Sequence, residues 1–193
     1  VVQHHPNNVY RLSHSMVPLG DALKAAVPEV KDFARFQNAG KTFIKYEDKK
    51  YYENNVKFVD QGIFNLFTIP VIQGNMATAL TEKFSVVITE SMAQKYFGDQ
   101  NPIGKNLIMD NQFTLTVTAI IEDFAENTHV DPDFMISFNT LQDLVGENFM
   151  NNWVTTRLIT YVLILDNKNL TNIEQKITQV MTENSSTEVK RSL

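Results

Sequence analysis

Apolar residues recur along this chain at helical spacing in some segments and at strand spacing in others, and the changes predict the order of its elements. Residues 10–13 predict a short strand after a polar lead. A helix is expected over residues 18–27, because Leu19 and Leu23 share one face of it, and a second strand is expected over residues 30–37. The N-terminal segment is therefore predicted to be β-α-β.

The middle of the chain is rich in aromatic and β-branched residues, which favour strands. A turn is predicted at Asn38-Ala39-Gly40, followed by a hairpin with strands over residues 42–46 and 51–59 around the charged tip 47–50. A short helical turn near Phe64 follows. Beyond it the pattern predicts a short strand over residues 85–88 and a helix over residues 92–97, which Thr89 or Ser91 can cap. Two more strands are predicted over residues 106–109 and 113–123.

From Phe134 the apolar residues return to helical spacing, as Phe138 and Leu141 show by lying three residues apart. A strand over residues 158–165 and a last helix capped by Thr171 complete an α-β-α run. The element order predicts a mixed α+β fold of two lobes. Both chain ends, residues 1–39 and 134–193, are expected to form one α/β lobe with a βαβ unit, and residues 40–133 are expected to form an inserted, β-rich lobe.

Composition narrows the possible functions. The chain has 193 residues, no cysteine and a net charge of −5, so disulfides and thiolate metal sites are excluded. No basic stripe suited to nucleic acid is present, and no apolar run approaches the roughly 20 residues that span a bilayer. The chain begins at Val1 with a polar segment, which predicts a fragment or a processed chain. His4-His5 belong either to the start of the domain or to a tag.

The segment from Gly98 to Lys105 superficially resembles a phosphate-binding loop. That loop needs four residues between its glycines and a hydroxyl residue after the lysine. Here five residues separate Gly98 from Gly104, one of them Pro102, and Asn106 stands in the hydroxyl position. A helix stop followed by a turn is the better interpretation.

An acidic group surrounds His129, and such a group can hold a divalent cation. Its spacing fits neither a calcium loop nor a zinc helix, so a solvated loop is the preferred interpretation. The carboxylates considered are Glu122, Asp123, Glu126, Asp131 and Asp133.

No catalytic constellation is visible. The chain has no G-x-S-x-G elbow, and His14 lies beside Ser13 and Ser15 on a predicted strand, where neighbouring side chains point to opposite faces. Trp153, the only tryptophan, is expected to be a packing anchor. The chain is therefore predicted not to be an enzyme and to need no cofactor or metal.

Several segments in the middle of the chain together resemble one family. The segments are Val59-Asp-Gln-Gly-Ile-Phe-Asn-Leu-Phe67, Gln73-Gly-Asn75 with Ala79-Leu80, Ser85-Val-Val-Ile-Thr-Glu-Ser-Met-Ala-Gln-Lys-Tyr-Phe-Gly98, Asn101-Pro-Ile-Gly-Lys105, Val117-Thr-Ala-Ile-Ile-Glu-Asp123, Asn127-Thr-His129 and Asp133-Phe-Met-Ile-Ser137. They resemble the MacB-like periplasmic core domain of FtsX-like ABC transporter permeases, in the Bacteroidetes version. The resemblance covers residues 9 to about 180. Ala119 departs from it where glycine is usual.

The resemblance implies a porter-like lobe with an inserted second lobe, on the periplasmic side of the bacterial inner membrane, between transmembrane helices of a multi-pass permease. It implies a cytoplasmic ABC ATPase as partner, and a periplasmic adaptor or a substrate (peptide, lipid, lipoprotein or antibiotic). The isolated domain is expected to be monomeric, and export and cell-wall signalling both remain open. A free-standing periplasmic ligand-binding module is the alternative.

The residues singled out by the resemblance are expected to be structural, with Gly98 and Gly104 in backbone turns and the phenylalanines and Tyr96 in the core of the inserted lobe. They are Phe64, Phe67, Gly74, Tyr96, Phe97, Gly98, Pro102, Gly104 and Trp153.

Overall fold

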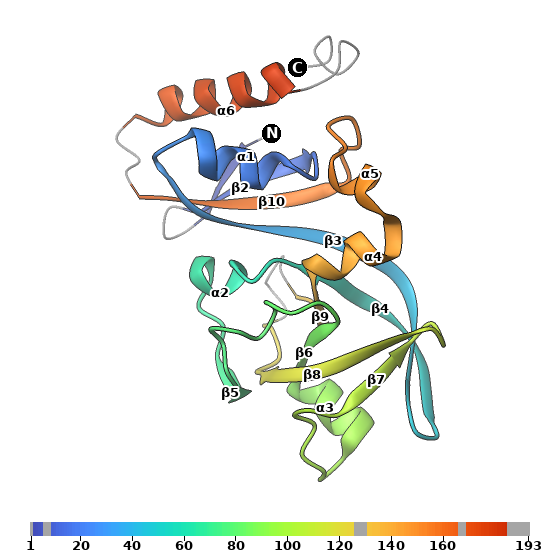
Figure 1. Cartoon of the computed structure of the whole chain (residues 1–193). Helices are drawn as coiled ribbons and strands as arrows, with labels where there is room; N and C mark the ends of the chain where they lie inside the picture. Colours follow the sequence, from blue (N-terminus) through green and yellow to red (C-terminus); the bar gives the residue numbers. More distant parts are fainter. Residues whose placement is uncertain (1, 6–8, 126–130, 166–168, 185–193) are drawn as a thin grey trace. The chain divides into compact units, whose positions relative to one another are not determined.

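The computed structural model describes residues 2–5, 9–125, 131–165 and 169–184 and has a mixed α+β fold (Figure 1). The chain divides into two compact units: unit 1 comprises residues 1–36 and 142–193, and unit 2 comprises residues 37–141. Unit 1 contains β1 (Val2–His5), β2 (Val9–Ser15), α1 (Leu19–Ala26), the first part of β3 (Val30–Tyr46), most of α4 (Leu141–Val145), α5 (Glu147–Met150), β10 (Leu158–Ile164) and α6 (Leu170–Asn184). Unit 2 contains the rest of β3, β4 (Lys49–Val59), α2 (Ile63–Leu66), β5 (Val71–Gly74), β6 (Ser85–Thr89), α3 (Glu90–Phe97), β7 (Asn106–Met109), β8 (Phe113–Ile121), β9 (Phe134–Ser137) and the 3-10 turn η2 (Phe138–Thr140).

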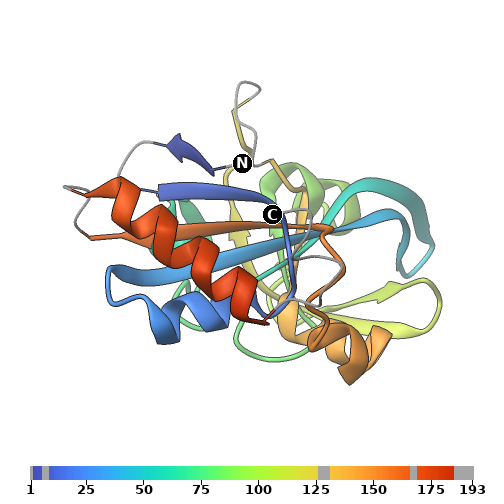
Figure 2. The ribbon, with the colours of Figure 1, turned by 90° about the horizontal axis from the view of Figure 1, so that it is seen from above.

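The sheet of unit 1 has the strand order β1-β2-β10-β3, with every neighbouring pair antiparallel. Strands from both ends of the chain thus lie together, because β10 pairs on one edge with β2 and on the other with β3. Helices α1 and α6 lie side by side over one face of this sheet (Figure 2). Their apolar faces, with Leu19 and Leu23 on α1 and Ile173 and Ile177 on α6, share one buried cluster with the strands.

Unit 1 also contains a buried arginine, whose guanidinium has hydrogen-bond acceptors within the unit. Arg35 is 6% exposed; its Nη1 donates to the carbonyl oxygen of Val17 at 2.9 Å and to Asp21 Oδ2 at 3.0 Å. Its guanidinium also lies 5.2 Å from the ring centroid of Phe33. These contacts attach β3 to the start of α1, because a buried guanidinium is tolerated only when its donors are engaged.

The strands of unit 2 form a closed ring. From β3 the pairing runs through β4, β9, β6 and β8 to β7, and β7 pairs back with β3. β5 is added to β8 outside this ring. Side chains pointing into the ring, such as Ile44, Leu107, Leu115 and Ile136, have 0% exposure. Closure removes the open edges that a sheet of this size would otherwise present.

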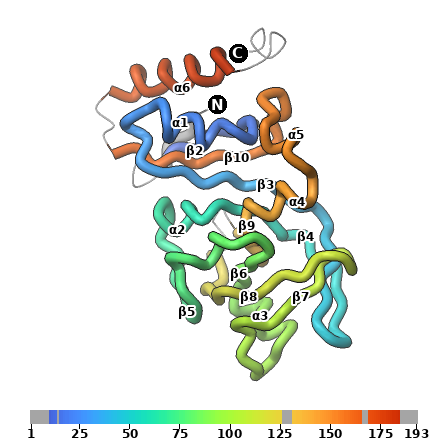
Figure 3. Tube along the Cα trace, in the orientation of Figure 1, coloured from blue at the N-terminus to red at the C-terminus, as the bar shows by residue number. Residues whose placement is uncertain are grey.

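The predicted turn at Asn38-Ala39-Gly40 does not end a strand, since β3 continues through it for 17 residues. The turn geometry is kept locally: Gly40 has φ +77°, and its N–H donates to Asn38 Oδ1 at 2.9 Å. The chain passes from unit 1 to unit 2 just before this point (Figure 3). The turn signal therefore marks a unit boundary inside one strand.

The prediction of a helix from Phe134 onward is wrong for the first four residues, because they form the strand β9. β9 is parallel to β4 and antiparallel to β6, and all four of its residues are buried. A strand that is covered on both faces has no polar alternation, so its spacing cannot be told from that of a helix. Helical structure begins only at η2 and α4, and Gly146, with φ +80°, separates α4 from α5.

Two predicted helix caps differ from the observed ones. Asn169 Oδ1 accepts a hydrogen bond from Asn172 N–H at 3.1 Å, so Asn169, not Thr171, caps α6. At the start of α3, Thr89 makes no capping hydrogen bond. Instead Asp123 accepts from Ser91, from its N–H at 3.4 Å and from its hydroxyl at 2.7 Å. A carboxylate from a distant strand end replaces the local cap.

Candidate functional site

A buried charged group in unit 2 joins β4 to α3. Glu53 is 7% exposed, and Lys95 Nζ lies 2.8 Å and 3.0 Å from its two carboxylate oxygens. The hydroxyl of Tyr96 donates to Glu53 Oε1 at 2.5 Å. The ammonium of Lys95 also lies 4.6 Å from the ring centroid of Tyr51, and the ring of Tyr96 meets Phe134 edge-on at 5.9 Å.

The group formed by Glu53, Lys95 and Tyr96 connects β4 to α3. In the described part of the chain, the side-chain partners of Glu53 are Lys95 and Tyr96, which use both carboxylate oxygens. Burial, and then the hydrogen bond to Glu53, raise the pKa of the Tyr96 hydroxyl above its ordinary value, so it stays protonated and donates. A carboxylate engaged in this way is not available as a general base.

Asp133 lies near the same group. Burial raises the pKa of its carboxyl group, and the negative charges of Glu53, Asp123 and Asp131 raise it further, while Lys95 lowers it. The folded state therefore favours the protonated form of Asp133. The stability that this group contributes is present below its unfolded pKa and is lost as the pH rises through the raised, folded pKa.

We therefore expect Asp133→Asn to raise the melting temperature at pH 7, because the amide has the same shape without the unfavourable charge. The gain should shrink as the pH falls and disappear below the ordinary pKa of aspartate, 3.8. Thermal unfolding of both proteins across this pH range measures it. A gain that is constant with pH would show that the charge of Asp133 is not its cause.

The acidic group proposed around His129 is only partly visible, since Glu126 and His129 lie outside the described residues. So do the side chains of His4, His5 and His14. Asp123 accepts hydrogen bonds from Ser91, as described above, and the carboxylate of Asp131 lies 3.1 Å from the ammonium of Lys57. Among the described residues, no three histidine or acidic side chains are placed to hold a metal ion together.

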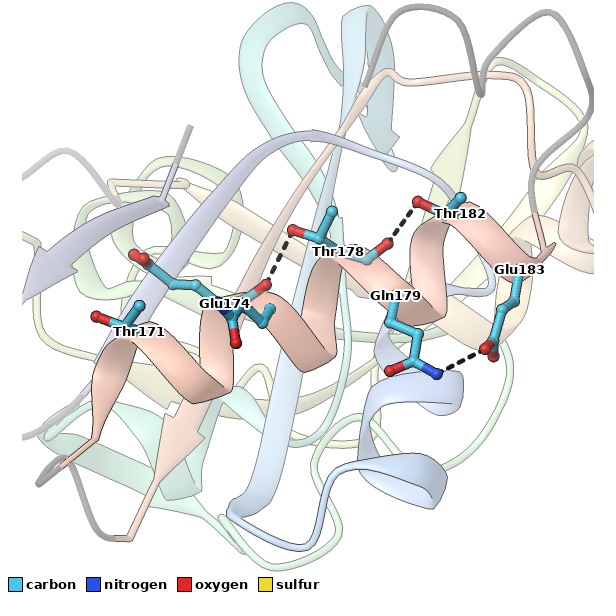
Figure 4. Close-up of a pocket in the computed structure, with 7 residues that line it drawn as sticks. Thr171, Glu174, Thr178, Gln179, Thr182 and Glu183 are labelled. Carbon is cyan, nitrogen blue, oxygen red and sulfur yellow. Dashed lines mark hydrogen bonds between the residues drawn. The ribbon is translucent and has the colours of Figure 1, made fainter.

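Surface hollows lie beside two of the helices. One, of about 540 Å³, lies beside the start of α3 and is lined by Glu90, Ser91, Gln94, Lys95 and Asp123. The other, of about 570 Å³, follows the outer face of α6 and is lined by Thr171, Glu174, Gln175, Thr178, Gln179, Thr182 and Glu183 (Figure 4).

The α6 hollow is a polar helix face and not an enclosed pocket, because all its lining residues come from one helix. Thr178 and Thr182 donate their hydroxyls to backbone carbonyls one turn earlier, at 2.9 Å and 2.8 Å. Gln179 Nε2 donates to Glu183 Oε1 at 2.7 Å. The helix backbone thus accepts from both threonine hydroxyls, Glu183 accepts from Gln179, and this open face does not enclose a small ligand.

The glycine-rich loop after α3 uses its backbone amides within the chain. Gly98 N–H donates to the carbonyl oxygen of Gln94 at 3.0 Å, Gly104 N–H to that of Val117 at 2.8 Å, and Lys105 N–H to that of Pro102 at 2.9 Å. A phosphate-binding loop needs such amides directed at the ligand. In this loop the Gly98 amide closes the last turn of α3, the Gly104 amide attaches the loop to β8, and Pro102 is buried.

Gly98 ends α3 with φ +59° and ψ −126°, a conformation that is essentially limited to glycine. A Cβ there would meet nothing within 4 Å, so only the backbone conformation opposes a side chain. We expect Gly98→Val to lower the free energy of unfolding by more than about 1 kcal/mol. Urea denaturation measures this value, and an unchanged midpoint would contradict it.

The other residues singled out in the sequence have varied environments. Tyr96 and Phe97 are buried, and Phe97 contacts Tyr46 with ring centroids 4.4 Å apart. Phe64 and Phe67 are only half-buried; the buried positions of α2 are Ile63 and Leu66. The predicted helical turn is present, but the two phenylalanines that the resemblance placed in the core of the inserted lobe are not its buried residues.

Gly74 and Trp153 are the remaining two. Gly74 has φ +103° and pairs with Ala119, so the small residue that departs from the family pattern lies opposite a glycine. Trp153 is half-buried and packs against the cluster beneath α1 and α6 in unit 1. Sequence reasoning did not find Glu53, which has no local signal of burial.

Comparison with known proteins identifies the family. The sequence model of the MacB-like periplasmic core domain matches residues 2–180. The chain belongs to the MacB-like periplasmic core domains. The family suggested by the sequence motifs is thus confirmed. Such a domain is the periplasmic part of an ABC transporter permease and is not catalytic by itself.

Solved structures share the fold of this MacB-like domain. A domain of a protein assigned as a permease in Porphyromonas gingivalis matches with a TM-score of 0.80 and 20% identity, covering 98% of this chain and 87% of that one. The periplasmic region of MacB from Actinobacillus actinomycetemcomitans matches with a TM-score of 0.68 and 16% identity, covering 89% and 75%.

A third structure, the extracellular domain of the noncanonic ABC-type transporter YknZ from Gram-positive bacteria, matches with a TM-score of 0.64 and 16% identity, covering 86% and 81%. No curated protein sequence matches the chain. Within the described part of the domain, no helix has both the length and the apolar character to cross a bilayer.

Proposed function

We propose that this domain is the extracytoplasmic part of a multi-pass ABC permease in the bacterial inner membrane. It passes ATP-driven conformational change across the membrane and contacts a substrate or an envelope partner. The observation that carries the proposal is the family match over residues 2–180. ATP would be hydrolysed by a separate cytoplasmic ATPase domain or subunit.

The chain topology supports this role. The first and last described elements, β1 and α6, both belong to unit 1, and unit 2 is inserted between β3 and α4. Transmembrane helices before and after the domain would therefore both connect to unit 1. Force from them would reach unit 2 through two chain connections, one of which lies within the 17-residue strand β3.

The test uses the full-length permease with its ATPase. Because the domain has no cysteine, cysteines introduced at Gln175 in unit 1 and Asp99 in unit 2, both exposed, would be its only spin-label sites. We expect the distance distribution between the two labels to differ between the nucleotide-free and the ATP-trapped states. A control pair at Asp99 and Thr114, both in unit 2, should keep its distribution. If the first pair also stays unchanged, the domain does not transmit the ATPase cycle in this way.

A second experiment separates export from cell-wall signalling. Cells that lack the parent gene are challenged with peptides and macrolides, and their cell-wall processing is examined. Increased sensitivity would support export. Unchanged sensitivity with abnormal cell-wall processing would contradict export and support signalling.

A further inference from the structure

The outward side of the ring wall in unit 2 carries a basic and aromatic surface. Along β3, alternate residues point inward and outward. Thr42, Ile44 and Tyr46 are buried, whereas Phe43 and Lys45 between them, and residues 37–41 before them, are exposed or half-buried. The apolar and basic residues that point outward near the hairpin turn and on the adjoining β7, here called the hairpin face, are Lys41, Phe43, Lys45, Lys50, Tyr52 and Ile108.

The apolar part of the hairpin face is a pair of rings. Phe43 and Tyr52 pack edge-to-face with centroids 5.3 Å apart, and the ammonium of Lys41 lies 4.8 Å from the Tyr52 centroid. Tyr52 is 63% exposed. On the other side of β3, Ile108 is directly opposite Lys45 in the β3–β7 pair. Exposed aromatic residues with a basic rim are typical of protein interfaces.

The lysines of this face have no acidic partner. In the described part of the chain, no salt bridge involves Lys41, Lys45 or Lys50, although the protein as a whole is acidic with net charge −5. The neighbouring carboxylate of Asp110 accepts the N–H of Phe43 at 3.0 Å. Among the described residues, none of these three ammonium groups is thus paired with a carboxylate.

Two of these lysines also face each other. The hairpin turn has two residues, Glu47 and Asp48, which places Phe43 opposite Tyr52, as their ring contact requires, and Lys45 opposite Lys50. Like charges directly opposite on a sheet are destabilising. A bound anionic group would relieve this repulsion.

We propose that the hairpin face binds an acidic segment of a partner protein. An apolar side chain of the segment rests on Phe43, Tyr52 and Ile108, and its carboxylates pair with the surrounding lysines. A membrane surface fits less well, since Phe43 and Ile108 are half-buried and the face has no protruding aliphatic side chain to enter a bilayer. The proposal does not depend on whether the domain serves export or signalling.

The test uses this chain and a fluorescein-labelled peptide with one tryptophan between two runs of three glutamates. We expect saturable binding in fluorescence anisotropy, with a Kd of about 0.1 mM or tighter, that weakens as NaCl is added. Lys45→Glu/Lys50→Glu should weaken binding about tenfold or more. Tyr52→Ala should weaken it about threefold or more. The matched control Lys31→Glu changes an exposed lysine of unit 1 and should have no effect.

A charge-swapped peptide, with lysines in place of the glutamates, controls for misfolding. It should bind the Lys45→Glu/Lys50→Glu variant better than the unmodified protein, which an unfolded variant would not explain. Equal affinity of the acidic peptide for the hairpin variants and the Lys31→Glu control would overturn the proposal, and so would no binding at about 1 mM peptide. Binding to phosphatidylglycerol vesicles without binding to the peptide would replace the protein partner with a lipid surface.

Discussion

Replacing Gly74 by alanine should be among the most destabilising single changes in this domain, with a loss of about 3 kcal/mol or more in the free energy of unfolding. A Cβ at this position would lie 2.4 Å from the carbonyl oxygen of Thr118 and 2.7 Å from the Cα of Ala119. Both are backbone atoms of β8 and cannot turn away. The φ of +103° adds strain for any residue other than glycine. Urea denaturation with a two-state fit measures the loss.

Gly40→Ala is the matched control, because Gly40 also has a positive φ, +77°, but a Cβ there would meet nothing within 4 Å. It should cost only about 1 kcal/mol. The difference between the two losses of unfolding free energy measures the cost of placing a Cβ where β5 lies close to β8. Equal losses would show that backbone conformation, and not this close approach, requires glycine at position 74.

Replacing Glu53 by leucine should lower the free energy of unfolding by about 2 kcal/mol, because it leaves the buried hydroxyl of Tyr96 without its acceptor. Lys95 contributes less to this loss. Its side chain is 33% exposed and can turn toward water. The exposed pair Lys24–Asp32 offers a comparison, and Lys24→Met should cost less than about 1 kcal/mol.

A double variant tests the cause directly. Tyr96→Phe removes the unpaired hydroxyl, so Glu53→Leu/Tyr96→Phe should be more stable than Glu53→Leu alone by about 1 kcal/mol. Chemical denaturation of the four proteins of this cycle gives the coupling between the two side chains. Simple additivity of the two single losses would mean that the short hydrogen bond between them does not stabilise the fold.

The sequence predicts best those helices and strands that have one buried face and one face exposed to solvent. The alternation of Leu115 and Val117 with threonines predicts β8, and the spacing of Leu19 and Leu23 predicts α1, because each pattern reports a half-buried surface. The same rule explains the main error. β9 is buried on both faces, so its apolar run carries no period, and the helical spacing of the residues that follow extends the predicted helix too far.

The candidate site depends on contacts that no local pattern contains. Glu53 lies 42 and 43 residues before Lys95 and Tyr96, its two partners. Asp123 reaches the start of α3 from 32 residues away and takes the place of the local cap that Thr89 or Ser91 was expected to provide. A local pattern records which face of an element is apolar, but it does not record which distant polar groups that face will meet.

The sequence alone therefore determined the fold class, the family, and the glycine at the end of α3, since these depend on residue order, local periodicity and backbone conformation. Tertiary structure decided how β7 closes the strand ring and which carboxylate is buried. These features arise when segments far apart in the chain pair, because hydrogen bonding between strands and the burial of charge are satisfied only in the assembled fold.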